Sequence, residues 1–281
     1  MAGHVEQAIL SPAGAGPVGP GQAEPPAAVS AKPCQVRDLG RMGYAEAFEL
    51  QRSLVEQRKR GEIPDQLLMV EHPHVVTMGR NGHDGNVLAS PEVLSRSGIE
   101  FHRTDRGGDV TYHGPGQIVG YPIFDLREWK RDVIAYVRGI EQVIIDALGS
   151  FGISAHRDPG ATGVWTTQGK VAAIGVHISR WVTSHGFALN VDTDLNYFRY
   201  IVPCGLTKPV TSMRALGAFT TPDTAATREQ VIAALERTFG RVFERDMERA
   251  QGAAESDRQA TNIACPHTTD RQATKIACPT Y

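Results

Sequence analysis

Residues 106–117 read RGGDVTYHGPGQ, and this glycine-rich segment leads directly into an apolar run that predicts a strand over residues 116–124. Four glycines, a proline, a histidine and an arginine fall within its twelve residues. Glycine loses the most backbone freedom on folding, so such a cluster favours a backbone that bends through positive φ or approaches a ligand closely. The N–H groups of Gly107 and Gly108 and the Arg106 guanidinium could converge on an electron-rich ligand group. The alternative is a Gly-Pro hairpin with a surface histidine.

The segments on either side of this turn predict an α+β fold. Apolar residues recur at helical spacing over residues 44–59 and 133–151, and Gly152 is expected to cap the second helix. A third helix is expected to begin at Thr227, where residues 227–230 match a capping box. Further strands are predicted at residues 66–71, 75–78, 170–178 and 184–191, the last two joined by a turn at 180–183. Strands and helices are interspersed without strict alternation, which favours a single α+β domain.

The two ends of the chain lack this periodicity. Residues 1–33 are rich in Ala, Pro and Gly, and DRQATNIACP at 257–266 recurs as DRQATKIACP at 270–279. We predict a disordered extension over residues 1–33, one folded domain over 34–249, and a weakly ordered tail with a duplicated decapeptide over 250–281. Cys265, His267 and Cys278 could hold zinc, but no fourth ligand has suitable spacing.

The composition is that of an ordinary globular protein, with 41% hydrophobic and 21% charged residues among 281. A net charge of −2 argues against a general nucleic-acid binder, and no apolar run has the length needed to span a bilayer. Residues 1–33 resemble neither a signal peptide nor an arginine-rich transit peptide, and four cysteines are too few for a disulfide scaffold. We therefore expect a cytoplasmic protein with no nucleic-acid or membrane partner.

Three further segments, together with the first, carry a family resemblance. They are MGRNGHDGNVLAS (78–90), GKVAAIGVHISRWVTSHGFALNVDTDL (169–195) and IVPCGL (201–206). In this order, the four segments resemble the octanoyltransferases of lipoate biosynthesis, the lipoyl(octanoyl) transferases, and the resemblance extends over residues 36–245. It implies the fold of the biotin/lipoate protein ligases, with mixed sheets and packed helices.

The resemblance also implies the reaction. An octanoyltransferase moves an octanoyl group from octanoyl-acyl carrier protein to the lysine ε-amine of a lipoyl domain, through a cysteine acyl-thioester. The acceptors would be the lipoyl domains of 2-oxoacid dehydrogenase complexes and the H protein of glycine cleavage. No cofactor or metal is expected, because the donor thioester already carries the activation energy.

Cys204 and Lys170 are the candidate catalytic residues. A thiolate is a strong nucleophile near neutral pH, although a free cysteine such as Cys204 can equally be a small buried hydrophobe. The resemblance implies that Cys204 carries the acyl group and that Lys170 is its partner. Taken alone, Lys170 could be a solvated surface residue. As a partner, it could act as a base or as a cation that lowers the pKa of the thiol, and the sequence leaves both roles open.

The resemblance implies a set of substrate contacts made by small or apolar residues and by the glycine-rich turn. They are Arg106, Gly107, Gly108, Asp109, Val110, Thr111, Tyr112, His113, Ala173, Ile174, Gly175, Gly186, Phe187 and Ala188. His113 and His185 each lie next to a glycine. Either histidine could position the thioester, support the oxyanion that forms on attack, or merely hydrogen-bond a turn. His177 is assigned no role.

Two other functions compete with acyl transfer. A lipoate–protein ligase of the same fold would activate a free acid with ATP, and it would not need a cysteine paired with a lysine. A non-catalytic module could bind a lipoyl domain or carrier protein without chemistry. The Pro203-Cys204-Gly205 element favours transfer over ligation, and the presence of both Cys204 and Lys170 argues against the non-catalytic module.

Overall fold

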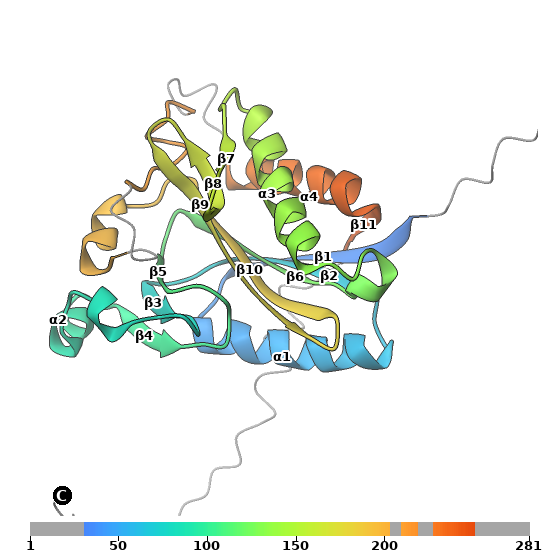
Figure 1. The fold of residues 1–281 in the computed structure, drawn as a ribbon, viewed down its shortest axis with the longest axis horizontal. Coiled ribbons are helices and arrows are strands. Elements are labelled where there is room, and N and C mark those ends of the chain that lie inside the picture. Colours follow the sequence, from blue (N-terminus) through green and yellow to red (C-terminus); the bar gives the residue numbers. More distant parts are fainter. Residues whose placement is uncertain (1–30, 203–208, 219–226, 251–281) are drawn as a thin grey trace, which may run out of the picture. The chain divides into compact units, whose positions relative to one another are not determined.

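The computed structural model describes residues 31–202, 209–218 and 227–250 (Figure 1). Its larger sheet has the strand order β11-β1-β2-β6-β10-β9-β8-β7, and its smaller sheet has the order β4-β3-β5. The strands of the larger sheet are β1 (Lys32–Arg41), β2 (Asp65–Glu71), β6 (Gln117–Ile123), β7 (His156–Asp158), β8 (Ala161–Thr166), β9 (Gly169–Ser179), β10 (Val182–Asn190) and β11 (Arg245–Arg249). Those of the smaller sheet are β3 (Val75–Met78), β4 (Glu100–Arg103) and β5 (Val110–His113).

Helices cover both faces of the larger sheet. Figure 1 shows α1 (Tyr44–Arg60) on one face, with α3 (Val133–Gly149) and α4 (Arg228–Phe243) on the other. The alternation of a strand supplies both interfaces: Leu67 of β2 packs in the core beneath α3 and α4, whereas Leu68 packs in the core beneath α1. The smaller sheet has its own core, which it shares with α2 (Pro91–Arg96) and the 3-10 helix η3 (Leu195–Tyr200).

The expected α+β class and most of the expected elements are confirmed. The helix expected from residue 44 is α1, and Gly61 caps it in the left-handed conformation at φ 75°. Thr227 forms the expected capping box with Gln230 at the start of α4. Strands β2 and β3, β6, and the pair β9–β10 occupy the predicted segments.

Two predicted boundaries are wrong. Helix α3 ends at Gly149 and is capped by Ser150 rather than Gly152. The turn between β9 and β10 contains only Arg180 and Trp181, both at positive φ (51° and 69°), and Val182 already belongs to β10. A two-residue turn with positive φ at both positions matches the right-handed twist of the strands, so the hairpin is tighter than expected.

The sequence did not predict the edge of the larger sheet. β1 pairs in parallel with both β2 and β11, so that residues 32–36 lie beside residues 245–249. The first strand therefore begins at Lys32 and the last strand ends at Arg249. The remainder of both ends, including Cys265, His267 and Cys278, lies outside the described residues, and the predictions for them stay predictions.

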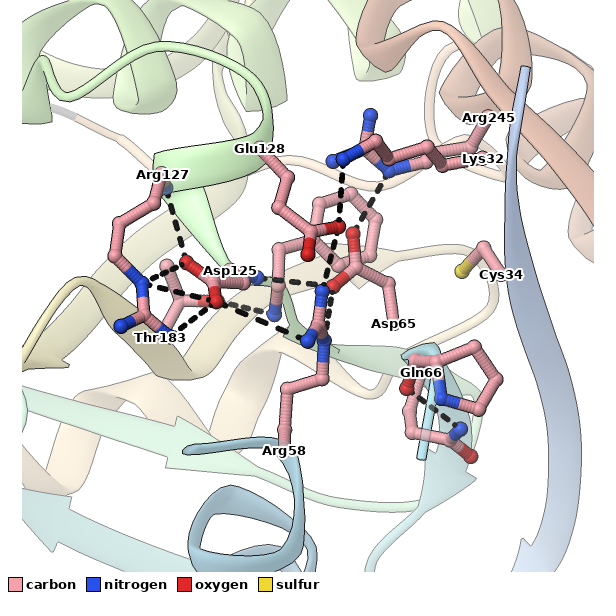
Figure 2. Close-up of polar contacts among 12 residues, drawn as sticks. Lys32, Cys34, Arg58, Asp65, Gln66, Asp125, Arg127, Glu128, Thr183 and Arg245 are labelled. Carbon is pink, nitrogen blue, oxygen red and sulfur yellow. Dashed lines mark hydrogen bonds and ion pairs between the residues drawn. The ribbon is translucent and has the colours of Figure 1, made fainter. Parts of the chain in front are cut away.

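A buried ion-pair network joins this edge to the rest of the fold (Figure 2). The Asp65 carboxylate accepts hydrogen bonds from Arg58 Nε and Arg245 Nε, each at 2.8 Å, and from the backbone N–H of Asp125 at 2.9 Å. Arg58 also pairs with Glu128 at 2.8 Å. The network thus connects α1, the start of β2, the start of β11 and the 3-10 helix η2 (Leu126–Glu128).

No helix among the described residues is long and apolar enough to cross a membrane. No group of three or more His, Cys, Asp or Glu side chains in the described ranges is arranged to hold a metal ion.

Candidate active site

A pocket of about 520 Å³, including the open solvent at its mouth, lies between the glycine-rich segment and the β9–β10 hairpin. Of the fourteen predicted substrate contacts, all except Gly107 and Tyr112 line it. The lining residues are Tyr44, Arg106, Gly108, Asp109, Val110, Thr111, His113, Val119, Tyr121, Lys170, Ala173, Ile174, Gly175, His185, Gly186, Phe187 and Ala188. Sequence reasoning did not identify Tyr44, Val119 and Tyr121, which come from α1 and β6.

Strand register brings the two predicted hairpin triplets together. Gly175 pairs with Gly186, Ile174 with Phe187, and Ala173 with Ala188 across the antiparallel β9–β10 pair. The sequence could indicate this pairing because both strands are local and share a short turn.

Glycine lets the glycine-rich segment lie directly against β9. The Gly107 N–H donates to Val176 O at 2.8 Å. A Cβ on Gly175 would lie only 2.7 Å from Gly107 O and 3.2 Å from Arg106 Cδ. A larger residue at position 175 would therefore displace this wall of the pocket.

A chain of hydrogen bonds orients the polar side chains of this wall. Arg106 Nη2 donates to Thr77 O at 2.7 Å and to Thr77 Oγ1 at 3.0 Å. Thr77 Oγ1 lies 3.4 Å from His113 Nε2, and His113 Nδ1 lies 2.8 Å from Gln117 Oε1. Gln117 Nε2 in turn donates to Asn190 Oδ1 at 2.9 Å, which links the wall to β10.

The same bonds define the tautomer of His113. The Gln117 amide uses its N–H groups on Asn190 Oδ1 and on the Tyr112 carbonyl, so its oxygen accepts from His113 Nδ1–H. Nε2 is then left to accept from the Thr77 hydroxyl. Burial, followed by the neighbouring His72, lowers the pKa of His113 to about 3. His113 is therefore a neutral ring with both nitrogens engaged.

Lys170 is the second residue of β9, and only 8% of it is exposed, so the surface-lysine interpretation is wrong. Its Nζ donates to Thr162 O at 3.1 Å and lies 4.7 Å from the centre of the Trp165 ring. Its backbone N–H donates to Pro209 O, and its carbonyl accepts from the Thr211 N–H, each at 2.9 Å. Lys170 thus joins the pocket to residues 209–211. Cys204 lies outside the described residues.

Comparison with known proteins assigns the family. Residues 43–240 match the family described as the lipoyl protein ligase A/B catalytic domain. The octanoyltransferase of Solibacter usitatus is 61% identical over 221 residues, which cover 79% of this chain and 97% of that protein. The octanoyltransferase of Koribacter versatilis is 56% identical over 216 residues, covering 74% and 84%. The chain belongs to the octanoyltransferase family. It is therefore an acyltransferase, as the sequence resemblance implied.

Solved structures confirm the fold expected for an octanoyltransferase. A T. acidophilum protein with bound lipoic acid, described as a lipoate protein ligase, superimposes with a TM-score of 0.62 at 16% identity, covering 82% of this chain and 95% of that chain. Lipoate-protein ligase A bound with ATP gives a TM-score of 0.58 at 15% identity, covering 83% and 95%. At these identities the likeness establishes the shared fold.

The two predicted contacts that do not line the pocket of this octanoyltransferase have other contacts. Gly107 uses its N–H to join β9, as described above. The Tyr112 hydroxyl lies 2.7 Å from His74 Nδ1, and its ring stacks on Tyr197 at 5.2 Å between ring centres, within the core of the smaller sheet. Both residues therefore stabilise the glycine-rich segment through contacts outside the pocket.

His185 lines the pocket and pairs with a carboxylate that sequence reasoning missed. Its Nε2 lies 2.7 Å from Asp105 Oδ1, and this hydrogen bond is the main reason why the pKa of Asp105 is lowered to about 2. His177 Nε2 lies 3.6 Å from the other oxygen of Asp105. His185 also adopts φ 56°, a left-handed conformation that is uncommon for histidine, and its N–H donates to Gln51 Oε1 at 2.9 Å. Asp105 directly precedes the quoted glycine-rich motif, but no local pattern linked it to position 185.

Proposed function

We propose that this octanoyltransferase transfers the acyl group in two steps, with Cys204 as the acyl carrier and Lys170 as its partner. The Cys204 thiolate attacks the carbonyl carbon of octanoyl-acyl carrier protein and forms the Cys204 thioester; the C–S bond to the carrier breaks, and the departing carrier thiolate takes up one proton. The ε-amine of a lipoyl-domain lysine then attacks the Cys204 thioester and loses a proton, which restores the Cys204 thiolate. The acceptors are the lipoyl domains of 2-oxoacid dehydrogenase complexes and the glycine cleavage H protein.

The observation that carries this proposal is the placement of Lys170. It lines the pocket, and its backbone is hydrogen-bonded on both sides to residues 209–211. Four residues lie between Cys204 and Pro209, and the five Cα–Cα steps that join them span at most about 18 Å when fully extended. This limit is consistent with the proposed pairing of Cys204 with Lys170.

The lining of the pocket suits an aliphatic chain ending in a thioester. Val119, Ile174 and Phe187 supply apolar surface, and the buried neighbour His113 is neutral. A smaller pocket of about 320 Å³, including open solvent, shares Lys170 and extends toward Val210, on the side of the chain that leads back to Cys204. We infer that the lining residues hold the octanoyl chain, and that His113 orders the pocket wall rather than exchanging protons, because both of its nitrogens are engaged.

Intact-mass spectrometry after incubation with octanoyl-acyl carrier protein tests the proposal. We expect one octanoyl adduct on the wild-type chain, no adduct on Cys204→Ser, and loss of the wild-type adduct when a lipoyl domain is added. Transfer by Cys204→Ser should fall by several orders of magnitude, because an alcohol is a far weaker nucleophile than a thiolate near neutral pH.

Cys265→Ser is the matched control, because it removes a thiol from the tail outside the family match, and it should keep the adduct. An adduct that persists in Cys204→Ser would overturn the assignment of the nucleophile. Modification of a lipoyl domain from free octanoate and ATP, without octanoyl-acyl carrier protein, would instead support the ligase alternative.

A further inference from the structure

We infer that Glu141 of α3 positions the Lys170 side chain and stabilises its charged form by acting through the peptide group between Thr162 and Gly163. The inference rests on the proposed role of Lys170 in acyl transfer. It assigns a positioning function to a buried carboxylate that lies outside the pocket.

One peptide group connects the two side chains. Its carbonyl, Thr162 O, accepts from Lys170 Nζ at 3.1 Å, and its N–H, on Gly163, donates to Glu141 Oε1 at 3.2 Å. The described chain contains no cis peptide bond, so this carbonyl and N–H point in opposite directions. The carboxylate and the ammonium therefore lie on opposite sides of one peptide group, aligned with its dipole.

This alignment lets the peptide group carry the electrostatic effect of Glu141 to Lys170. A carboxylate at the N–H end polarises the peptide and increases the negative charge on its carbonyl oxygen, which strengthens the bond to the ammonium. Glu141 is fully buried, so water screens this effect weakly. A neutral amine at Lys170 would gain much less from the same carbonyl, so the arrangement favours the ammonium.

Glu141 is itself held in place by two arginines. Its Oε2 accepts from Arg138 at 2.7 Å and from Arg157 at 3.1 Å, which leaves Oε1 directed at the Gly163 N–H. The arginine side chains are 48% and 35% exposed, whereas Glu141 is not exposed at all. The carboxylate is therefore anchored from the solvent side and directed inward.

Gly163 is required for this geometry. It adopts φ 129°, and a Cβ there would lie 2.7 Å from Ala172 O and 3.2 Å from Lys170 Cε. A side chain at this position would strain the backbone and press on the lysine, so only glycine allows the peptide to lie between the two charged groups.

Other charged and titratable groups also face Lys170. Those lining the same pocket are Tyr44, Arg106, Asp109, His113, Tyr121 and His185. Glu141, with Arg138 and Arg157, acts from the opposite side of β8. The test must therefore change the charge behind β8 and leave the pocket lining intact.

Glu141→Gln makes this change, because glutamine keeps an acceptor for the Gly163 N–H and removes the charge. The full chain contains six lysines, so the Lys170 Cε signal can be followed by NMR in protein labelled with 13C-lysine and assigned with Lys170→Arg. We expect Lys170 in Glu141→Gln to release its proton at a pH about 0.5–1 unit lower than in wild type. Asp146→Asn is the matched control, since it removes another carboxylate from α3 that pairs instead with Arg241 at 2.7 Å. It should leave Lys170 unchanged.

A second variant gives a shift of the opposite sign. Arg157→Gln removes a cation from Glu141 and leaves its carboxylate less neutralised, so Lys170 should release its proton at a higher pH than in wild type. Because Arg157 is partly exposed, this variant is expected to fold even where Glu141→Gln does not. Shifts of opposite sign are not produced by a general loss of stability.

The outcomes separate this inference from the proposed function. No shift in either variant, or shifts in the same direction, would overturn the coupling between Glu141 and Lys170. If the NMR shifts appear as expected but the pH profile of octanoyl transfer does not follow them, the coupling holds and the proposed role of Lys170 in transfer fails.

Discussion

The Asp65 network and the pocket both bury polar groups, but they satisfy them differently. Around Asp65, each carboxylate meets a guanidinium directly, as Figure 2 shows for Arg58 and Arg245. In the pocket wall, Arg106 donates to a threonine instead, and His113 is a neutral link between a hydroxyl and an amide. Asp65 is buried within its network, whereas Arg106 and His113 line the pocket.

This difference separates structural charges from functional ones. Buried charges that pair with each other are neutralised within the fold, and they connect elements that are distant in sequence. Polar groups oriented by neutral hydrogen bonds keep their shape and polarity available to a ligand. We therefore expect substitutions in the network to act mainly on stability, and substitutions in the pocket to act mainly on turnover.

The largest effect is expected for Asp65→Ala. It leaves the buried guanidiniums of Arg58 and Arg245 without their shared carboxylate, which should lower the free energy of unfolding by about 3–5 kcal/mol. Urea denaturation measures the loss, and octanoyl transfer per folded molecule should change little. Asp84→Ala is the control, because Asp84 pairs with Arg103 at an exposed site and should cost at most about 1 kcal/mol. A loss no larger than that control would show that the network does not hold the fold together.

Gly175→Ala should have a smaller effect and a different signature. The new methyl group would press on Gly107 O and Arg106 and move the pocket wall, so we expect octanoyl transfer to fall by a factor of about 10–100. The free energy of unfolding should fall by about 1–3 kcal/mol. Gly149→Ala in α3 is the control, since nothing lies within 4 Å of its added Cβ. Steady-state kinetics with folded protein provide the measurement, and unchanged turnover would contradict the assignment of this wall to the site.

The sequence predicted the pocket better than the network because the pocket is built from local motifs. The glycine-rich segment and the β9–β10 hairpin each bring their residues together within a short stretch of sequence. The family resemblance identifies both segments. The network joins Arg58, Asp65 and Arg245, and its last two members are 180 residues apart. No periodicity links such positions, and the edge strands β1 and β11 that bring them together were also missed.

Glu141 was missed for a related reason. It lies on α3, a helix that the sequence predicted, and it is fully buried beside Val143 and Ile144. A charged residue between apolar positions of a helix looks solvent-exposed until the partner elements are known. Only the folded structure, which brings the Gly163 N–H of β8 and Arg157 of β7 to Glu141, shows why a carboxylate is buried there.

The smallest effect concerns the pH dependence of stability. His72 is fully buried behind the pocket, where its Nδ1 donates to Met42 O at 2.8 Å and its Nε2 accepts from the Tyr121 hydroxyl at 2.7 Å. Protonation of His72 would make Nε2 a hydrogen-bond donor, although its partner, the Tyr121 hydroxyl, is already the donor in this bond. Burial lowers the pKa of His72 to about 4, against about 6.5 in the unfolded chain. Between these values the unfolded state binds a proton that the folded state does not, so stability falls as the pH falls.

One histidine of this kind contributes about 1.4 kcal/mol per pH unit to the slope, and His113 adds a second contribution over the same range. The Asp105 carboxylate changes the stability only at pH values below this range, because its pKa is lowered to about 2.

We expect His72→Gln to reduce the slope of the unfolding free energy between pH 6 and 4.5 by about 1.4 kcal/mol per pH unit. Its stability at neutral pH can change as well, so the slope is the decisive quantity. His156→Gln replaces an exposed histidine and should keep the wild-type slope. Urea denaturation at several pH values measures all three proteins. An unchanged slope in His72→Gln would mean that the neutral histidines behind the pocket do not make this region more acid-sensitive than the paired charges around Asp65.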